Sequence, residues 1–248
     1  MSVHVHRYTP TDPRLGRHIE HDSRSLDFLH PELDEATLKP VDWTRRIPIL
    51  DQGQLGSCTG NALTGVLGTD SAGRTATISV NVKRDSHKVF TAGSHVLDET
   101  FATAAYELNT RLDSIPGQFP PNDTGSSSLG AGKTGVALGL FSGYTHAVSN
   151  LALKSALQKG AVLIGIPWLK SMFTPDSGGN VPVDRRSGLA GGHELAVSAW
   201  DGARYRIDNS WGVSWGLAGS AWIAETSMAW LLQQGGDVLV PTWAQAAA

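Results

Sequence analysis

The spacing of apolar residues predicts several amphipathic helices. Ala62, Leu63, Val66 and Leu67 form one buried stripe of a helix that starts near Cys58 and that Gly68 would close. The same reasoning predicts helices over residues 97–112, 129–140, 151–159 and 227–233. In the helix over residues 97–112, Tyr106 is expected to be a core aromatic rather than a residue of a substrate cleft.

Alternating or continuous β-branched stretches predict strands. Residues 75–82 alternate and are expected to pair with residues 89–91, as a surface hairpin inserted over 75–96. Residues 161–167 predict a buried strand, residues 219–224 a closing strand, and residues 171–191 a loop. A strand that carries His193 precedes the turn signal Asp201-Gly202, and a second strand leads to Asn209. A two-residue turn there would place His193 and Asn209 within one position of each other across the ladder.

The chain divides into an arm, a domain and a tail. Residues 1–40 are polar and proline-containing, residues 41–240 carry the predicted helices and strands, and residues 241–248 carry no signal. We expect the arm to be a permanent strap across the domain. It has no recognisable long helical propeptide, so we expect no zymogen control.

Composition describes an ordinary globular protein of 248 residues and 26.3 kDa with 40% hydrophobic residues. The net charge of −3 gives no basic surface for nucleic acid or anionic membranes. The first residues contain no hydrophobic signal core, and one cysteine allows no internal disulfide. We therefore expect a reducing cytoplasm, bacterial or phage-infected, with delivery by a phage as the alternative. We expect no metal and no cofactor, because the histidines of the arm lack ligand spacing.

The candidate chemistry centres on Cys58, the only cysteine of the chain. At the first turn of a helix, free N–H groups and the helix dipole favour a thiolate. Gln52 precedes it by six residues and carries an amide that is able to donate a hydrogen bond to an oxyanion. Asn209 would fix the tautomer of His193 and leave its other ring nitrogen for the cysteine. These residues together indicate acyl transfer through a thiol nucleophile.

Three segments resemble the papain family of cysteine peptidases, in its bacterial and viral form. They are the segment Gln52-Gly53-x-x-Gly56-Ser57-Cys58, the strand after Gly192-His193, and Asn209-Ser210-Trp211-Gly212-x-x-Trp215-Gly216. The resemblance implies an α+β fold of two lobes, in which a helical lobe with the cysteine helix packs against an antiparallel, barrel-like β lobe and the cleft lies between them. It also implies a peptidase with Cys58 as nucleophile, His193 as base and acid, Asn209 as its orienting group, and Gln52 in the oxyanion hole.

For substrate binding, the resemblance implies that Gly125 and Ser126 pair with an extended peptide, that Gly192 lines the cleft, and that Trp211 shields the His–Asn bond. The expected partner is a peptide or protein substrate. Two departures bear on the polarity of the cleft: Thr59 replaces a tryptophan of eukaryotic members, and Glu194 follows the histidine directly. Two alternatives stay open, namely an amidase or endopeptidase of bacterial cell-wall crosslinks, and a binding protein that has kept the fold without turnover.

Overall fold

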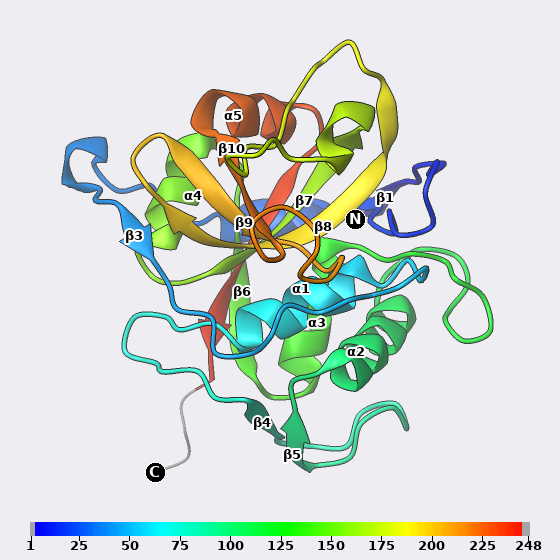
Figure 1. Cartoon of the computed structure of the whole chain (residues 1–248). Helices are drawn as coiled ribbons and strands as arrows, with labels where there is room; N and C mark the ends of the chain where they lie inside the picture. Colours follow the sequence, from blue (N-terminus) through cyan, green and yellow to red (C-terminus); the bar gives the residue numbers. More distant parts are fainter. Residues whose placement is uncertain (1–2, 245–248) are drawn as a thin grey trace.

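The computed structural model describes residues 3–244, in which a large antiparallel sheet is covered by helices (Figure 1). The sheet has seven strands in the order β10-β9-β8-β7-β11-β6, with β3 paired to β8. Its strands are β3 (Val41–Asp42), β6 (Phe141–Ala147), β7 (Val162–Leu169), β8 (Leu189–Trp200), β9 (Arg204–Asp208), β10 (Ser220–Ala224) and β11 (Asp237–Trp243). Within the described residues this sheet is open, so the expected barrel-like lobe is not a closed barrel.

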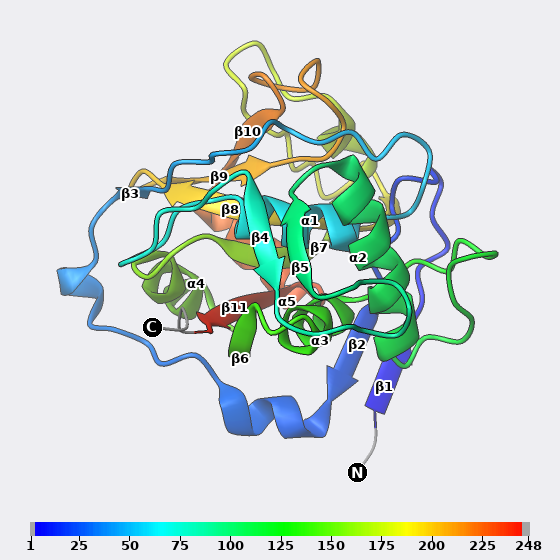
Figure 2. The same ribbon diagram turned by 90° about the horizontal axis from the view of Figure 1, so that it is seen from below.

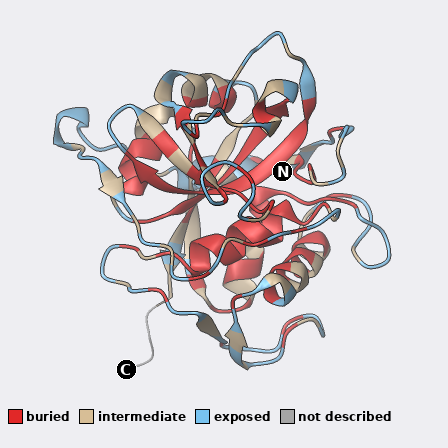
Figure 3. Cartoon of the chain, viewed as in Figure 1, coloured by how far each residue is buried: buried red, intermediate tan, exposed pale blue. Residues whose placement is uncertain are grey.

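Helices pack on both faces of the sheet. One face carries α1 (Cys58–Leu67), α2 (Glu99–Leu112) and α3 (Ser128–Ala137), and the other carries α4 (Asn150–Leu157) and α5 (Glu225–Gln233) (Figure 1). Strand β7 is buried on both sides: Val162 and Ile164 contact one core cluster, and Leu163 contacts the other. A strand that is covered on both faces needs apolar residues at successive positions, which explains the continuous apolar sequence of β7. Figure 3 shows α1 buried along its whole length.

Side-chain caps set the starts of the helices. Asp98, Ser127 and Ser149 each accept a hydrogen bond from a backbone N–H of the first turn of α2, α3 and α4. The helix expected from residue 97 therefore begins at Glu99. Among residues 3–244, no helix is both long and apolar enough to cross a lipid bilayer.

The hairpin of β8 and β9 has a longer turn than the expected two-residue tip. The Asp201 side chain accepts hydrogen bonds from two following backbone N–H groups at 2.9 and 2.7 Å, and pairing begins with Trp200 opposite Tyr205. A bulge between Val197 and Ala199 shifts the register again. The predicted cross-strand register is therefore wrong, because the Asp201 side chain stabilises a wider turn.

Other strands also differ from the expectations. The inserted hairpin pairs β4 (Ser79–Val82) with β5 (Gly93–Val96), so residues 89–91 lie in the connection between the strands. The sequence signal also missed β6 and β11, and β11 extends into the predicted tail. The last four residues of that tail lie outside the described residues.

The arm passes through the junction of the two lobes and then around the outside of the molecule. It contains β1 (Val3–His6) paired with β2 (Ile19–Asp22), then the short helices η1 (Ser23–Phe28) and η2 (Glu35–Thr37) before β3. Figure 2 shows this path from β1 and β2 along the surface to β3. The segment between β1 and β2 is pinned by bridges from Gly16 to Gly192 and from Arg17 to Ser126. The arm therefore contacts the sheet and the helical side at once.

Candidate active site

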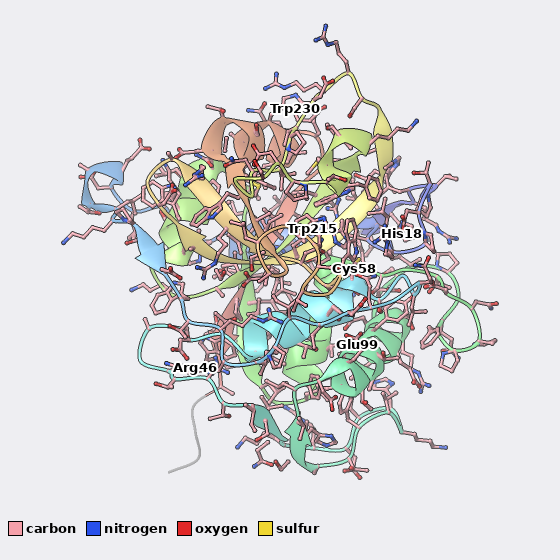
Figure 4. All side chains as sticks on the ribbon, in the orientation of Figure 1. His18, Arg46, Cys58, Glu99, Trp215 and Trp230 are labelled. Carbon is pink, nitrogen blue, oxygen red and sulfur yellow. The ribbon has the colours of Figure 1, made fainter. Side chains whose placement is uncertain are left out.

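Cys58 is the first residue of α1 and lies where that helix meets the sheet (Figure 4). Helix α1 packs against β8, the strand that carries His193. The predicted position of the cysteine at a helix N-terminus is confirmed. Its thiol is fully buried, however, because the arm crosses the site.

His193 and Asn209 form the expected pair. The Nε2 of His193 lies 2.8 Å from the Oδ1 of Asn209, which also accepts a hydrogen bond from the backbone N–H of Ser210 at 2.8 Å. An oxygen that accepts from Nε2 selects the tautomer with the proton on Nε2. The Nδ1 of His193 has no hydrogen-bond partner among the described residues, so it is left as the basic atom.

Two tryptophans enclose the imidazole. The Trp211 ring lies against His193 with a centroid separation of 4.8 Å, and the Trp168 ring meets it edge-on at 5.0 Å. The predicted shield, Trp211, thus lies beside the His–Asn bond. Burial lowers the pKa of His193 to about 4, so the imidazole is neutral in this conformation.

The thiol is also neutral in this conformation. Burial raises the pKa of Cys58 to about 12, and the carboxylate of Glu194 acts in the same direction. The expected thiolate–imidazolium pair is therefore not the state described here. The physical reason is burial, since the arm covers Cys58 and the two tryptophans enclose His193; the helix terminus alone does not overcome that desolvation.

Gln52 is held in a fixed orientation. Its Oε1 accepts a hydrogen bond from the Ser210 hydroxyl at 2.6 Å, and its Nε2 donates to the carbonyl oxygens of Leu55 (2.7 Å) and Arg14 (3.0 Å). The Gln52 amide nitrogen therefore faces the arm, and one of its N–H groups already donates to the Arg14 carbonyl oxygen. Sequence reasoning missed the role of Ser210, although it lies directly between Asn209 and Trp211.

The predicted substrate-binding residues pair with the arm. Ser126 donates its N–H to the Gly16 carbonyl at 2.8 Å and accepts at its own carbonyl from the His18 N–H at 2.7 Å. Gly192 accepts at its carbonyl from the Arg17 N–H at 3.1 Å. A methyl group on Gly125 would lie 2.3 Å from the Gly16 carbonyl oxygen, so only glycine permits this approach.

Tyr106 and Asp123 support this binding edge. The Tyr106 hydroxyl donates to a carboxylate oxygen of Asp123 and accepts from the Gly125 N–H at 2.9 Å. The other carboxylate oxygen of Asp123 accepts from the Gly56 N–H at 2.8 Å. Tyr106 is buried as predicted, and its hydroxyl also positions the loop at Gly125. The sequence alone did not indicate this use, because the partners are distant along the chain.

The arm itself fits closely against the cysteine loop. A methyl group on Gly16 would lie 1.9 Å from the Gly56 carbonyl oxygen, and the guanidinium of Arg14 covers the Trp211 ring at 4.2 Å. The strap expected from the sequence does touch both lobes, but it also fills the cleft. The expected absence of zymogen control stays a prediction, which the activity of a chain without the arm would test.

Comparison with known proteins identifies the fold of the chain through solved structures alone. No family model matches the chain, and no curated protein matches it. Among solved structures, xylellain, a cysteine protease from Xylella fastidiosa, aligns over 97% of this chain and 98% of its own, with 18% identity and a TM-score of 0.59. The chain has a papain-like fold. A recombinant stem bromelain precursor (14% identity, 88% of this chain and 76% of that one, TM-score 0.52) is similar.

A third similar structure is digestive procathepsin L 3 of Tenebrio molitor larval midgut, with 18% identity, 93% of this chain and 76% of that one covered, and a TM-score of 0.51. These neighbours are papain-family cysteine proteases. The papain-like fold accounts for a cysteine helix packed against the strand of a histidine. At these identities the likeness shows the fold, and the chemistry rests on the residues described above.

If Gln52 is part of an oxyanion hole, replacing it with alanine is expected to lower kcat by about 10²-fold or more, because its amide would stabilise charge that appears only in the tetrahedral intermediate. The rate of alkylation of Cys58 should change little. Peptide hydrolysis and iodoacetamide labelling measure the two effects. Gln233→Ala, at the exposed last residue of α5, is the matched control. An unchanged kcat would show that Gln52 is not part of the oxyanion hole.

Docking of the arm should weaken in acid because of His18. Its Nδ1 accepts from the Tyr8 N–H at 3.1 Å, its Nε2 contacts the Thr124 carbonyl oxygen at 3.1 Å, and burial lowers its pKa to about 4. The docked form favours the neutral ring, so its stabilising contribution is complete above pH 6.5 and is lost as the pH falls toward 4. The thermal midpoint should therefore drop by a few degrees more between pH 7 and pH 5 in the native chain than in His18→Gln. Equal drops would contradict this assignment.

Proposed function

We propose that the chain is a cysteine peptidase that hydrolyses peptide bonds through Cys58, His193 and Asn209. The proposal rests on one contact: the 2.8 Å bond between His193 Nε2 and Asn209 Oδ1, which leaves Nδ1 as the base on the strand packed against the cysteine helix. A protein that only binds peptides has no use for this tautomer beside a helix-terminal thiol. The neighbouring amide of Gln52 supplies the donor that acyl transfer needs.

The reaction would proceed in two halves once a substrate replaces the arm. Nδ1 of His193 takes the thiol proton, and Cys58 Sγ attacks the scissile carbonyl carbon. The oxyanion is stabilised by Gln52 Nε2 and the Cys58 N–H, and the imidazolium then protonates the leaving amine. This leaves a thioester. Water, deprotonated by Nδ1, attacks the thioester to release the carboxylic acid and return the thiol.

The conformation described here is, on this proposal, the closed state of that peptidase. The arm fills the site from Arg14 to His18, and it uses the same backbone groups that an extended substrate would use. Two of the similar structures are named as a precursor and a procathepsin. Displacement of the arm would expose Cys58 to solvent and to His193, and would thereby lower the cost of forming the ion pair.

Assays on casein and on purified peptidoglycan test the proposal, with full-length native chain and Cys58→Ala compared side by side. The expected result is release of casein peptides by the native chain, increased by conditions that loosen the arm and absent in the variant. Release of new amino groups from peptidoglycan alone would replace the protein substrate with cell-wall peptides. If neither polymer is cut while Cys58 is alkylated normally, the proposed function is wrong.

A further inference from the structure

One side chain of the arm enters a closed charged pocket beside the active site. The side chain of Arg17 is fully buried; its Nη2 donates to Asp237 Oδ1 and, at 2.9 Å, to the Gly235 carbonyl. Its Nη1 lies 3.4 Å from the Tyr8 hydroxyl. The carboxylate of Glu194, the residue after the catalytic base, also acts electrostatically on this guanidinium. A single cation is thus held between two acids.

The acids belong to the body of the protein rather than to the arm. Glu194 lies on β8 and Asp237 on β11, and the Oε2 of Glu194 accepts from the Ser128 hydroxyl at 2.8 Å. Gly165 on β7 makes the space: a methyl group there would lie 2.5 Å from Arg17 Nε, 2.5 Å from an Asp237 oxygen and 2.7 Å from a Glu194 oxygen. The pocket therefore persists when the arm leaves.

The pocket lies beside the path that the arm follows through the site, where a substrate would also lie. The backbone N–H of Arg17 donates to Gly192, the residue before His193, and the neighbouring Gly16 pairs with Ser126. These contacts involve only backbone atoms, so any extended peptide is able to make them. Only the side chain at the position of Arg17 therefore distinguishes one bound peptide from another.

We propose that the pocket of Glu194, Asp237 and Gly165 selects substrates with an arginine side chain at the position that replaces Arg17. The inference rests on the proposed peptidase function and names its substrate class. With the arm displaced, the partly exposed Asp237 and the buried Glu194 lose the guanidinium beside them, and one acceptor, Glu194 Oε1, has no partner among the described residues even when Arg17 is bound. A guanidinium restores the ion pair with Asp237 and places its positive charge near Glu194.

The size of the preference for arginine depends on the interactions that the pocket loses when it holds another side chain. Leucine or citrulline would leave Asp237 without its cation and the buried Glu194 without a nearby positive charge, and both losses disfavour binding. We therefore expect arginine to exceed both in kcat/KM by about 10²-fold or more. Lysine should fall between them, because an ammonium carries the charge but lacks the fixed planar donors with which the guanidinium contacts Asp237 and the Gly235 carbonyl.

The experiment uses the full-length chain with Gly16→Ala, in which the added methyl group prevents the arm from seating. Fluorogenic tetrapeptides carry arginine, lysine, citrulline or leucine at each of the three positions before the scissile bond. The expected result is one position at which arginine is preferred. Adding Asp237→Asn should remove most of that preference while hydrolysis of the leucine peptide persists. Asp27→Asn, on the exposed η1, is the matched control.

A second measurement does not depend on turnover. In full-length Arg17→Ala the pocket lacks its cation, so millimolar ethylguanidinium should raise the thermal midpoint, whereas its neutral isostere ethylurea should not. The native chain should respond to neither. This comparison shows whether the pocket accepts a free guanidinium.

The outcomes separate the two proposals. Cleavage of all peptides with no arginine preference overturns the pocket proposal and leaves the peptidase intact, whether or not ethylguanidinium binds. Failure to cleave any peptide, with Cys58 still reactive, overturns the peptidase. In that case the substrate preference falls with the peptidase, and selective stabilisation of Arg17→Ala by ethylguanidinium would show only that the pocket binds a guanidinium.

Discussion

A single methyl group at position 16 should activate the protein. Gly16→Ala would place that group 1.9 Å from the Gly56 carbonyl oxygen, in a backbone contact that has no flexible side chain to move aside. The arm must then lift from Cys58, whose pKa of about 12 in the closed state reflects burial first of all. We expect iodoacetamide labelling near pH 6 and peptide hydrolysis to rise by about tenfold or more, since exposure restores the thiolate.

Gly143→Ala is the matched control, because a methyl group there would meet nothing within 4 Å. It should leave labelling and hydrolysis at the native values. If Gly16→Ala remains folded, labels as slowly as the native chain and hydrolyses no faster, the arm is not what restrains Cys58. Deletion of residues 1–39 asks the same question in another way, since a pure strap predicts lower activity and a blocking segment predicts higher activity.

Loss of the imidazole should nearly abolish turnover. In the Gly16→Ala chain, His193→Ala removes the group that, in the proposed mechanism, takes the thiol proton and gives it to the leaving amine. We expect kcat to fall by about 10³-fold or more, because acid–base catalysis and thiolate formation are lost together. The labelling rate should also change its pH profile, tracking an ordinary thiol with a pKa near 8.5.

His95→Ala provides the matched control, since that half-buried histidine lies on β5 in the inserted hairpin and contacts a local carbonyl. Its kinetics should match the parent chain. A His193→Ala variant that retains most of its turnover, or keeps a low thiol pKa, would contradict the assigned pair. The pH profile separates this role from simple destabilisation, which lowers the amount of active protein without shifting a pKa.

Much of the site was predictable because its parts are local. The stripe after Cys58 defines the helix, and a turn between His193 and Asn209 is enough to bring two strands together. The register was wrong, since the wide turn at Asp201 and a bulge shift the ladder. The two side chains still meet because Asn209 lies just beyond the last residue of β9 and its N–H bonds to Gly219.

The burial of the arm in the site was not predictable from the sequence, and the cause is physical. A polar, proline-containing segment usually lies in solvent, and nothing local shows that Gly16 or Arg17 is buried. Their burial depends on Asp237 and Gly192, which lie some two hundred residues away along the chain. Strand β11 was missed for a related reason, since a short apolar run with a proline near the end of the chain gives a weak strand signal.

Attachment of the arm to the chain that it covers has a kinetic consequence. A tethered segment faces its site at an effective concentration on the order of millimolar, however dilute the protein is. Even weak docking therefore keeps the cleft closed, and dilution does not open it. Opening is a first-order event within one molecule, and a peptide that enters must compete with that local concentration rather than with free inhibitor.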